Sequence, residues 1–179
     1  MTGVQTCALP ICAAQLSKLA TDHLNMLTTE QFSALSTAQL FALTTAQTSA
    51  LESADLAALT TAQFASFATK VIAAFDSADI AALTTGQVAA MRTDQIRAIT
   101  TDDLKGLSTD DLVALTGGQM VGFNTTQLAA LSSDQLNVLG ETQLQGLRNT
   151  QLNTLTTDAL NALTASQFAK LTKIGRAHV

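Results

Sequence analysis

Few residues of this chain have side chains that could carry chemistry, and these residues are scattered. His23 is the only histidine of the repetitive part of the sequence. A hydrolytic triad places a histidine between a nucleophile and a carboxylate, yet no cysteine, second histidine or pair of carboxylates recurs at helical spacing beside His23. We interpret His23 as a substitute for the glutamine that most repeats carry at this position, or as an exposed residue near one end.

Two pairs of aspartates form the second candidate. Asp102-Asp103 and Asp110-Asp111 lie one repeat apart, so stacked repeats could bring four carboxylates together as a weak Ca²⁺ site. Hard cations prefer several oxygen ligands, but aspartates also suit the first turn of a helix, where negative charge is stabilised. The sequence has neither an EF-hand loop nor the glycine-rich pattern of calcium-binding β-rolls. We favour the helix interpretation and predict no catalytic, cofactor-binding or metal-binding residue.

Gly117-Gly118 is the third candidate, because loops that bind phosphate are rich in glycine. Such a loop follows a strand and contains a lysine, and neither is present here. These two glycines, like Gly106, Gly122 and Gly146, are therefore expected at helix junctions or at close backbone contacts. No insertion interrupts the repeats to form a cleft, so we expect a protein that is not an enzyme and that uses no cofactor.

The element that must position every side chain is an eight-residue repeat, Leu-Thr-Thr-x-Gln-Leu-x-Ala, which runs in register from Leu19 to Leu171. Position eight is small, usually alanine or glycine, and position seven varies freely and is expected to face solvent. Positions one and six are apolar, with Thr48 as the one exception, and form the predicted core. The predicted core residues at position one are Leu19, Leu27, Leu35, Leu43, Leu51, Leu59, Phe67, Phe75, Leu83, Met91, Ile99, Leu107, Leu115, Phe123, Leu131, Leu139, Leu147, Leu155, Leu163 and Leu171. Those at position six are Leu24, Phe32, Leu40, Leu56, Phe64, Ile72, Ile80, Val88, Ile96, Leu104, Leu112, Met120, Leu128, Leu136, Leu144, Leu152, Leu160 and Phe168.

This octad cannot form one long helix. Each residue of an α-helix advances by about 100°, so an eight-residue period rotates the apolar stripe by about 80° per repeat. Positions two to five commonly read Ser/Thr-x-x-Gln, as in Thr28-Thr29-Glu30-Gln31, which is the pattern of a capping box. We predict that each octad begins a new helix, with its N-cap at position two or three.

These features predict an all-α solenoid with one very short helix per octad. A helix of about six residues is unstable alone because nucleation is costly, so the repeats must stack around a shared core. A β-solenoid is the alternative, because short periods, threonine and stacked glutamine also suit it. Helices are favoured because the apolar positions do not keep a period of two, and because alanine, leucine and glutamine prefer helices.

The two ends of the chain depart from the octad. Residues 1–12 resemble a translated sequencing adapter, and residues 173–179 resemble the reverse complement of the same adapter. We therefore divide the chain into an adapter-derived, disordered tail at 1–12, a single repeat array at 13–172, and a second adapter-derived tail at 173–179. Because Cys7 and Cys12 fall in the first tail, cysteine usage gives no indication of the redox compartment.

Charge and hydropathy argue against two classes of partner. The net charge of −5 is spread thinly, without the clustered lysine and arginine that would neutralise a phosphate backbone, so nucleic acid is not an expected partner. The sequence contains no run of about twenty apolar residues, so no membrane span is predicted.

The octad as it stands in Leu59-Thr-Thr-Ala-Gln-Phe-Ala-Ser66 resembles octapeptide tracts of large bacterial surface-associated or secreted proteins of the adhesin type. The resemblance implies a bacterial source, a longer parent protein at the cell surface or secreted, and a structural role as a spacer or stalk. The alternative is a module that binds protein or glycan through one face, for which only Arg92, Arg97 and Lys105 give an indication. Self-association through the exposed ends of the solenoid is a further expectation.

Overall fold

The structure, a computed structural model, describes residues 12–177. Our expectations for residues 1–11 and 178–179 lie outside these residues. Within 12–177 the chain forms nineteen α-helices and one 3₁₀ helix, and it contains no strand. The prediction of an all-α solenoid with one helix per octad is confirmed, and the β-solenoid alternative is wrong.

The helices form three columns, because the principal contacts of each helix are with the helices three octads before and after it. The first column consists of α1 (Ala13–Leu16), α4 (Thr37–Phe41), α7 (Thr61–Ala65), α10 (Thr85–Ala89), α12 (Thr109–Ala114), α15 (Ser133–Asn137) and α18 (Thr157–Ala162). The second consists of α2 (Thr21–Leu24), α5 (Thr45–Thr48), α8 (Thr69–Ile72), α11 (Thr93–Ala98), α13 (Gly117–Met120), α16 (Glu141–Gln145) and α19 (Ala165–Ala177). The third consists of α3 (Thr29–Ser33), α6 (Ser53–Ala58), α9 (Ser77–Ala82), the 3₁₀ helix η1 (Asp103–Gly106), α14 (Thr125–Ala130) and α17 (Asn149–Leu152).

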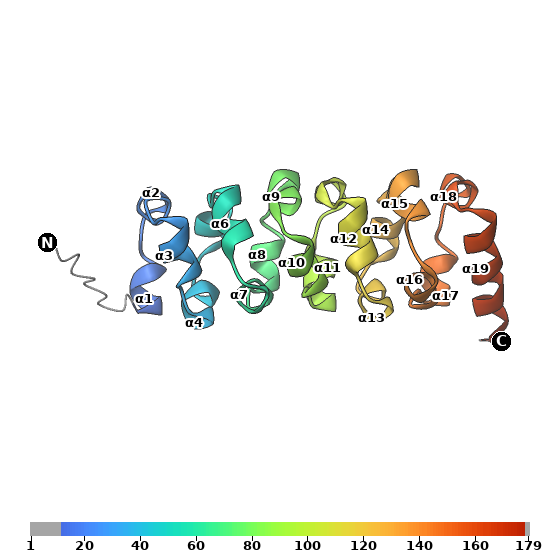
Figure 1. Cartoon of the computed structure of the whole chain (residues 1–179), viewed down its shortest axis with the longest axis horizontal. Coiled ribbons are helices and arrows are strands. Elements are labelled where there is room, and N and C mark those ends of the chain that lie inside the picture. The colour runs from blue at the N-terminus through green and yellow to red at the C-terminus, as the bar shows by residue number, and fades with distance from the viewer. Residues whose placement is uncertain (1–11, 178–179) are drawn as a thin grey trace, which may run out of the picture.

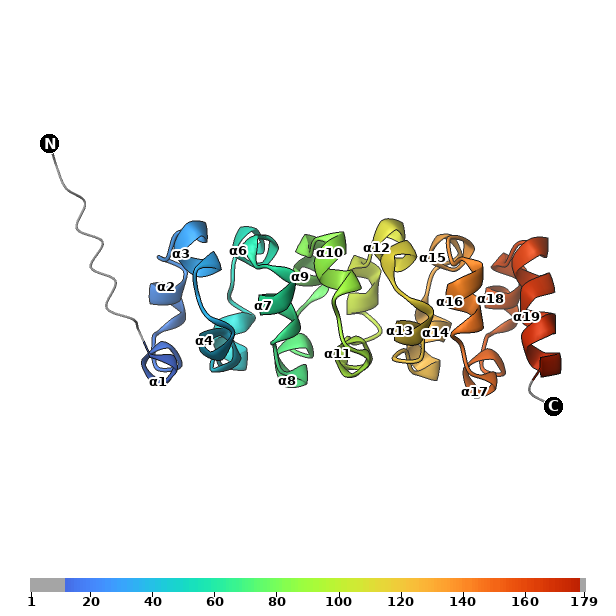
Figure 2. The same ribbon diagram turned by 60° about the horizontal axis from the view of Figure 1, so that its bottom comes forward.

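One turn of the solenoid therefore contains three octads. The turns follow one another along an elongated molecule, and α1 and α19 lie at opposite ends of it (Figure 1). The same succession of turns is visible when the molecule is rotated (Figure 2).

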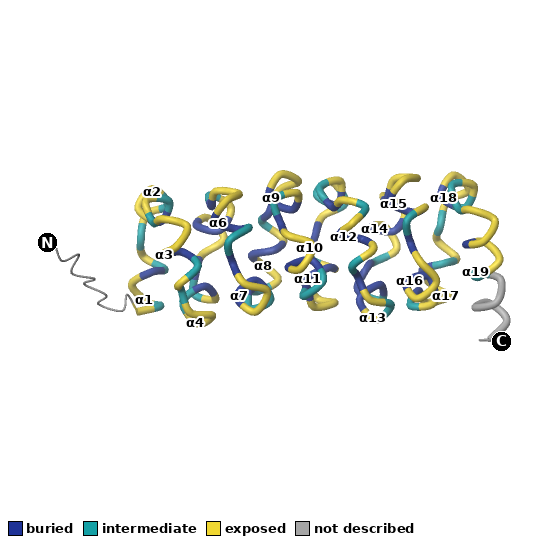
Figure 3. Tube along the Cα trace, viewed as in Figure 1, coloured by how far each residue is buried: buried dark blue, intermediate teal, exposed yellow. Residues whose placement is uncertain are grey.

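The core runs through the interior of the solenoid, with exposed residues on the outside (Figure 3). Positions one and six are buried throughout the middle of the array, as predicted, whereas Leu27 near one end and Leu163 near the other are only partly buried. Thr48, the polar exception at position six, is fully buried and its hydroxyl donates to the carbonyl oxygens of Thr44 and Thr45, both at 3.1 Å. This polar core residue is thus satisfied by its own helix.

The N-cap lies at position two of the octad, which settles the choice between positions two and three. Thr28, Ser36 and Thr84 each accept a hydrogen bond at 3.3 Å from the position-five N–H, as the capping box requires. The only helix with its N-cap elsewhere among those whose cap is defined is η1, which follows Asp102.

The last helix shows the effect of losing the Ser/Thr-x-x-Gln capping pattern. After Leu171 the sequence reads Thr-Lys-Ile-Gly, without the position-five glutamine. Helix α19 does not break there but continues to Ala177, so it has 13 residues where the 3₁₀ helix and the other α-helices have four to six. Helix α8 nevertheless begins as a separate helix after Ala68, with no side-chain cap and with Val71 at position five, so the capping pattern favours the break between helices but is not required at every octad.

Glycine at position eight allows two helices of one column to approach closely. A Cβ atom built on Gly146 would lie 1.9 Å from the carbonyl oxygen of Gly117, and one built on Gly106 would lie 2.3 Å from that of Ser77. These distances are too short for any side chain. The expectation of close-contact glycines is confirmed for Gly106, Gly117, Gly122 and Gly146, whereas Gly118 has no close neighbour.

We expect Gly146→Ala to destabilise the chain by about 1–3 kcal/mol, because α16 must move away from α13 to admit the methyl group. The matched control is Gly86→Ala, where the nearest atom, Thr61 Cγ2, lies at an ordinary contact distance of 3.6 Å. Alanine there should stabilise α10 by up to about 1 kcal/mol. Thermal unfolding followed by circular dichroism measures both, and equal effects of the two substitutions would contradict the close contact.

Candidate functional site

The most frequently repeated polar feature of the interior is the position-five glutamine, whose side chain joins two turns of the solenoid. In Gln87, Oε1 accepts from the N–H of Thr84 at 2.8 Å, which caps the glutamine's own helix. Its Nε2 donates to the carbonyl oxygens of Leu56 at 2.7 Å and Leu59 at 2.8 Å, which belong to the preceding turn. The side chain is fully buried. One amide group therefore bonds to three backbone groups from two turns.

Among residues 12–177, ten glutamines make this contact with another described residue, and we call them the cross-turn glutamines. Each donates to the position-one carbonyl 28 residues earlier and to a second carbonyl 30 or 31 residues earlier, near the C-terminal end of a helix. They are Gln47, Gln63, Gln87, Gln95, Gln119, Gln127, Gln135, Gln143, Gln151 and Gln167.

Sequence reasoning predicted the capping half of this arrangement and missed the cross-turn half. A signal was present in the choice of residue, since glutamate serves equally well in a capping box but has no N–H to donate. A second signal was that glutamine persists where position two cannot provide a capping side chain. Gly140 has no side chain, yet its N–H donates to Gln143 Oε1 at 2.6 Å, and the N–H of Arg148 donates to Gln151 Oε1 at 2.7 Å.

Aspartate replaces the glutamine in three consecutive turns of the third column. Asp55 lies on α6, Asp79 on α9 and Asp103 on η1. Asp79 still caps its helix by accepting from the N–H of Asp76 at 3.1 Å, but an ionised carboxylate cannot donate to the preceding turn. Burial, with added repulsion from Asp76 and Asp103, raises the pKa of the Asp79 carboxyl above its ordinary value.

The two aspartate pairs do not come together as a metal site. Asp103 lies in the third column and Asp111 in the first, where Asp111 accepts from the Ser108 N–H at 3.0 Å. Asp102 forms an exposed ion pair with Lys105 at 3.0 Å. Within residues 12–177 no group of three or more histidine, cysteine, aspartate or glutamate side chains is placed to hold a metal ion.

The other residues that the sequence suggested as functional also lie apart from one another. His23 is exposed on α2. The Arg92 guanidinium donates to the Ala65 and Phe67 carbonyl oxygens, the same acceptors that Gln95 uses, and pairs with Asp94 at 3.1 Å. Arg97 lies on α11 of the second column and Lys105 on η1 of the third, both exposed as expected for position seven.

The ion pair with Arg92 changes the pKa of the Asp94 carboxyl. A hydrogen bond from the guanidinium lowers the pKa of the Asp94 carboxyl below its ordinary value. Because both side chains are largely exposed, the pair contributes little to stability.

Five overlapping stretches of the chain match the model of the ALTTAQ repeat: residues 30–61, 48–85, 72–109, 88–125 and 107–141. Together they run from residue 30 to residue 141, more than half of the chain. The chain belongs to the ALTTAQ repeat family. The phrase Ala-Leu-Thr-Thr-Ala-Gln stands unaltered at residues 42–47 and 58–63. In this ALTTAQ repeat protein, the phrase contains the small position-eight residue, the core leucine, the N-cap and the cross-turn glutamine, in that order.

The other comparison gives no relative of known role, since no curated protein matches this ALTTAQ repeat chain significantly. Across residues 12–177, none of the helices combines the length and the apolar character needed to cross a lipid bilayer.

We expect Gln87→Met to destabilise the ALTTAQ repeat chain by about 1–3 kcal/mol, because it leaves the N–H of Thr84 and the carbonyl group of Leu59 without a partner and leaves the Leu56 carbonyl with only the Leu59 N–H. The matched control is Gln31→Met, since exposed Gln31 caps its helix at 3.0 Å and makes no cross-turn bond to residues 12–177. Chemical denaturation should show the smaller loss for the control. Equal losses would mean that the cross-turn bonds contribute nothing.

We expect Asp79→Asn to raise stability at neutral pH by up to about 1 kcal/mol, because it removes a buried charge that the folded chain holds unfavourably. The folded-state pKa is raised, so protonation favours folding, and the native chain gains stability from Asp79 as the pH falls through that pKa. The gain of the variant should therefore shrink in acid. Asp94→Asn is the contrast, since it removes a carboxylate of lowered pKa and should cost a few tenths of a kcal/mol at neutral pH. Denaturation midpoints measured between pH 3 and pH 8 check both expectations. If the two substitutions shift the midpoint in the same direction at neutral pH, the opposite pKa shifts of Asp79 and Asp94 would be contradicted.

Proposed function

We propose that this array is a non-catalytic spacer or stalk within a longer bacterial protein that is secreted or surface-associated. The observation that carries the proposal is the recurrence of one contact between turns. The cross-turn glutamines make the same bonds at ten of the sixteen octads from α5 to α19, and the position-one and position-six side chains continue one core beneath them.

A rod built in this way suits a spacer for two physical reasons. Each added set of three octads lengthens the rod by one turn and buries the same surfaces, so length can change without changing the fold. Each turn is also bonded to the next by buried amides, which opposes bending. Helices α1 and α19 lie at opposite ends of the molecule, so domains joined beyond them would be held apart (Figure 1).

The alternative, a protein- or glycan-binding module, has less support. It depended on Arg92, Arg97 and Lys105 forming one surface. Arg92 is engaged with backbone carbonyls of the preceding turn and with Asp94, and Lys105 is paired with Asp102 in another column. The spacer role is therefore the better proposal.

Small-angle X-ray scattering tests the spacer role. A compact domain of this length has a radius of gyration of about 16 Å. We expect a clearly larger value and a pair-distance distribution with a long tail, as a rod gives. A radius near that of a compact domain, or a curve that shows a flexible chain, would overturn the proposal. The surface location is tested separately by the reading frame of the parent gene, which should encode a secretion signal.

A further inference from the structure

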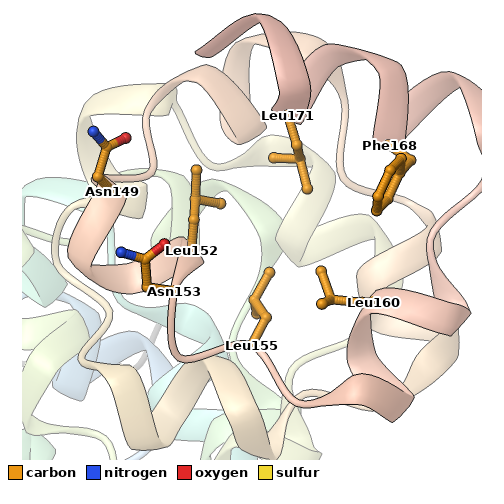
Figure 4. Close-up of a pocket in the computed structure, with 7 residues that line it drawn as sticks. All are labelled: Asn149, Leu152, Asn153, Leu155, Leu160, Phe168 and Leu171. Atoms are coloured by element: carbon orange, nitrogen blue, oxygen red, sulfur yellow. The ribbon is translucent and has the colours of Figure 1, made fainter. Parts of the chain in front are cut away.

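The C-terminal end of the solenoid leaves core side chains uncovered. An open cavity of about 380 Å³ lies between α17, α18 and α19, and Figure 4 shows Leu152, Leu155, Leu160, Phe168 and Leu171 around it. All five occupy positions one or six of the octad. In the middle of the array, the turn that follows covers the side chains at these positions. Phe168 is 50% exposed, whereas Phe64 at the same octad position is 0% exposed.

The same end also offers backbone acceptors. The position-one carbonyls of Leu147, Leu155 and Leu163 receive no hydrogen bond from residues 12–177. In the interior, the equivalent carbonyls of Leu115 and Leu139 accept from cross-turn glutamines at 3.0 and 2.9 Å. These three acceptors therefore lack the donor that the next turn would supply.

The N-terminal end offers the missing donors. Gln15 and Gln31 are exposed and cap their own helices through Oε1, at 2.9 and 3.0 Å, but their Nε2 atoms make no hydrogen bond with residues 12–177. His23, the position-five residue between them, is exposed as well. Leu19, Leu27 and Leu35 are packed on the core but only partly buried.

We propose that copies of this chain stack head to tail, with the first turn of one copy covering the last turn of the next. Counting octads onward from the C-terminal end places Gln15, His23 and Gln31 of the second copy at the Leu147, Leu155 and Leu163 carbonyls, in the same order and at the same spacing. The contact continues the interface that already joins successive turns within the array. The proposal does not depend on the spacer role, because a rod that remains monomeric could still serve as a spacer.

Such a contact joins two different surfaces, so it does not close on itself. Each added copy presents a new C-terminal end or N-terminal end, and the assembly grows as an open filament. This separates it from a symmetric dimer, in which one surface would pair with itself.

Sedimentation velocity of the whole chain over a range of concentrations tests the proposal. We expect a monomer of 18.6 kDa at low concentration and a series of its multiples as the concentration rises. A monomer at every concentration up to about 1 mM, or a single closed dimer, would overturn the proposal. A chain that stays monomeric at 1 mM would have an association free energy weaker than about −4 kcal/mol.

Two variants, each altered at one end, make the test specific. Gln31→Glu keeps an acceptor for its own helix but sets a carboxylate against carbonyl oxygens, and Phe168→Glu places a charge at the cavity. Each alone should weaken association at least tenfold. Mixed, they should form a one-to-one dimer and nothing larger, because each variant retains one intact end. Failure of the mixture to dimerise would contradict head-to-tail stacking.

The matched control is Val113→Glu, which introduces the same charge at an exposed apolar residue on α12, in the middle of the array. It should associate as the parent chain does. Circular dichroism of all three variants checks that each remains folded, and loss of association in the control would mean that added charge, rather than the ends, is responsible.

Discussion

A helix of four to six residues consists almost entirely of ends, and this constraint governs the whole molecule. The first four N–H groups and the last four carbonyl groups of any α-helix lack partners within it. In an array of such helices, nearly every backbone group near a helix end needs a partner from elsewhere. The cross-turn glutamines meet this need at both ends, since Oε1 caps one helix while Nε2 bonds to carbonyls at a corner of the preceding turn. The capping box and the stacking of turns are thus one interaction.

The other regularities of the array follow from that contact. Position eight is usually small because it faces position three of the helix one turn earlier, as Gly146 does with Gly117, although Met26 and Val138 also occupy this position. Positions one and six, apart from Thr48, are apolar because they fill the space between the three columns. Loss of a single cross-turn bond is tolerated because the core beneath it is continuous, and Val71 takes the glutamine position while remaining fully buried. The array can drift at single octads without losing its fold.

The residues that suggested chemistry prove to be parts of the same framework. Asp111 caps a helix, Arg92 bonds to the carbonyls that Gln95 also uses, and the paired glycines are divided between a close contact and an open site. None of these roles needed a ligand. Self-association through the ends was expected from the sequence, but the donors at residues 15–31 and the acceptors at residues 147–163, on which the proposed head-to-tail contact rests, are recognised only once the cross-turn bonds of the interior are known.

The sequence by itself determined much of the local structure: that a helix begins in each octad, which positions are buried, and that the helices must break in every octad. These features depend on contacts within about eight residues, which one repeat contains. Only the tertiary structure decided that a turn holds three octads, that the N-cap is at position two, and that Gln87 bonds to Leu56 and Leu59. The physical reason is that the number of octads per turn depends on how close the columns approach and on which carbonyls an amide can reach. Every octad presents nearly the same residues, so the sequence alone does not distinguish one stacking partner from another.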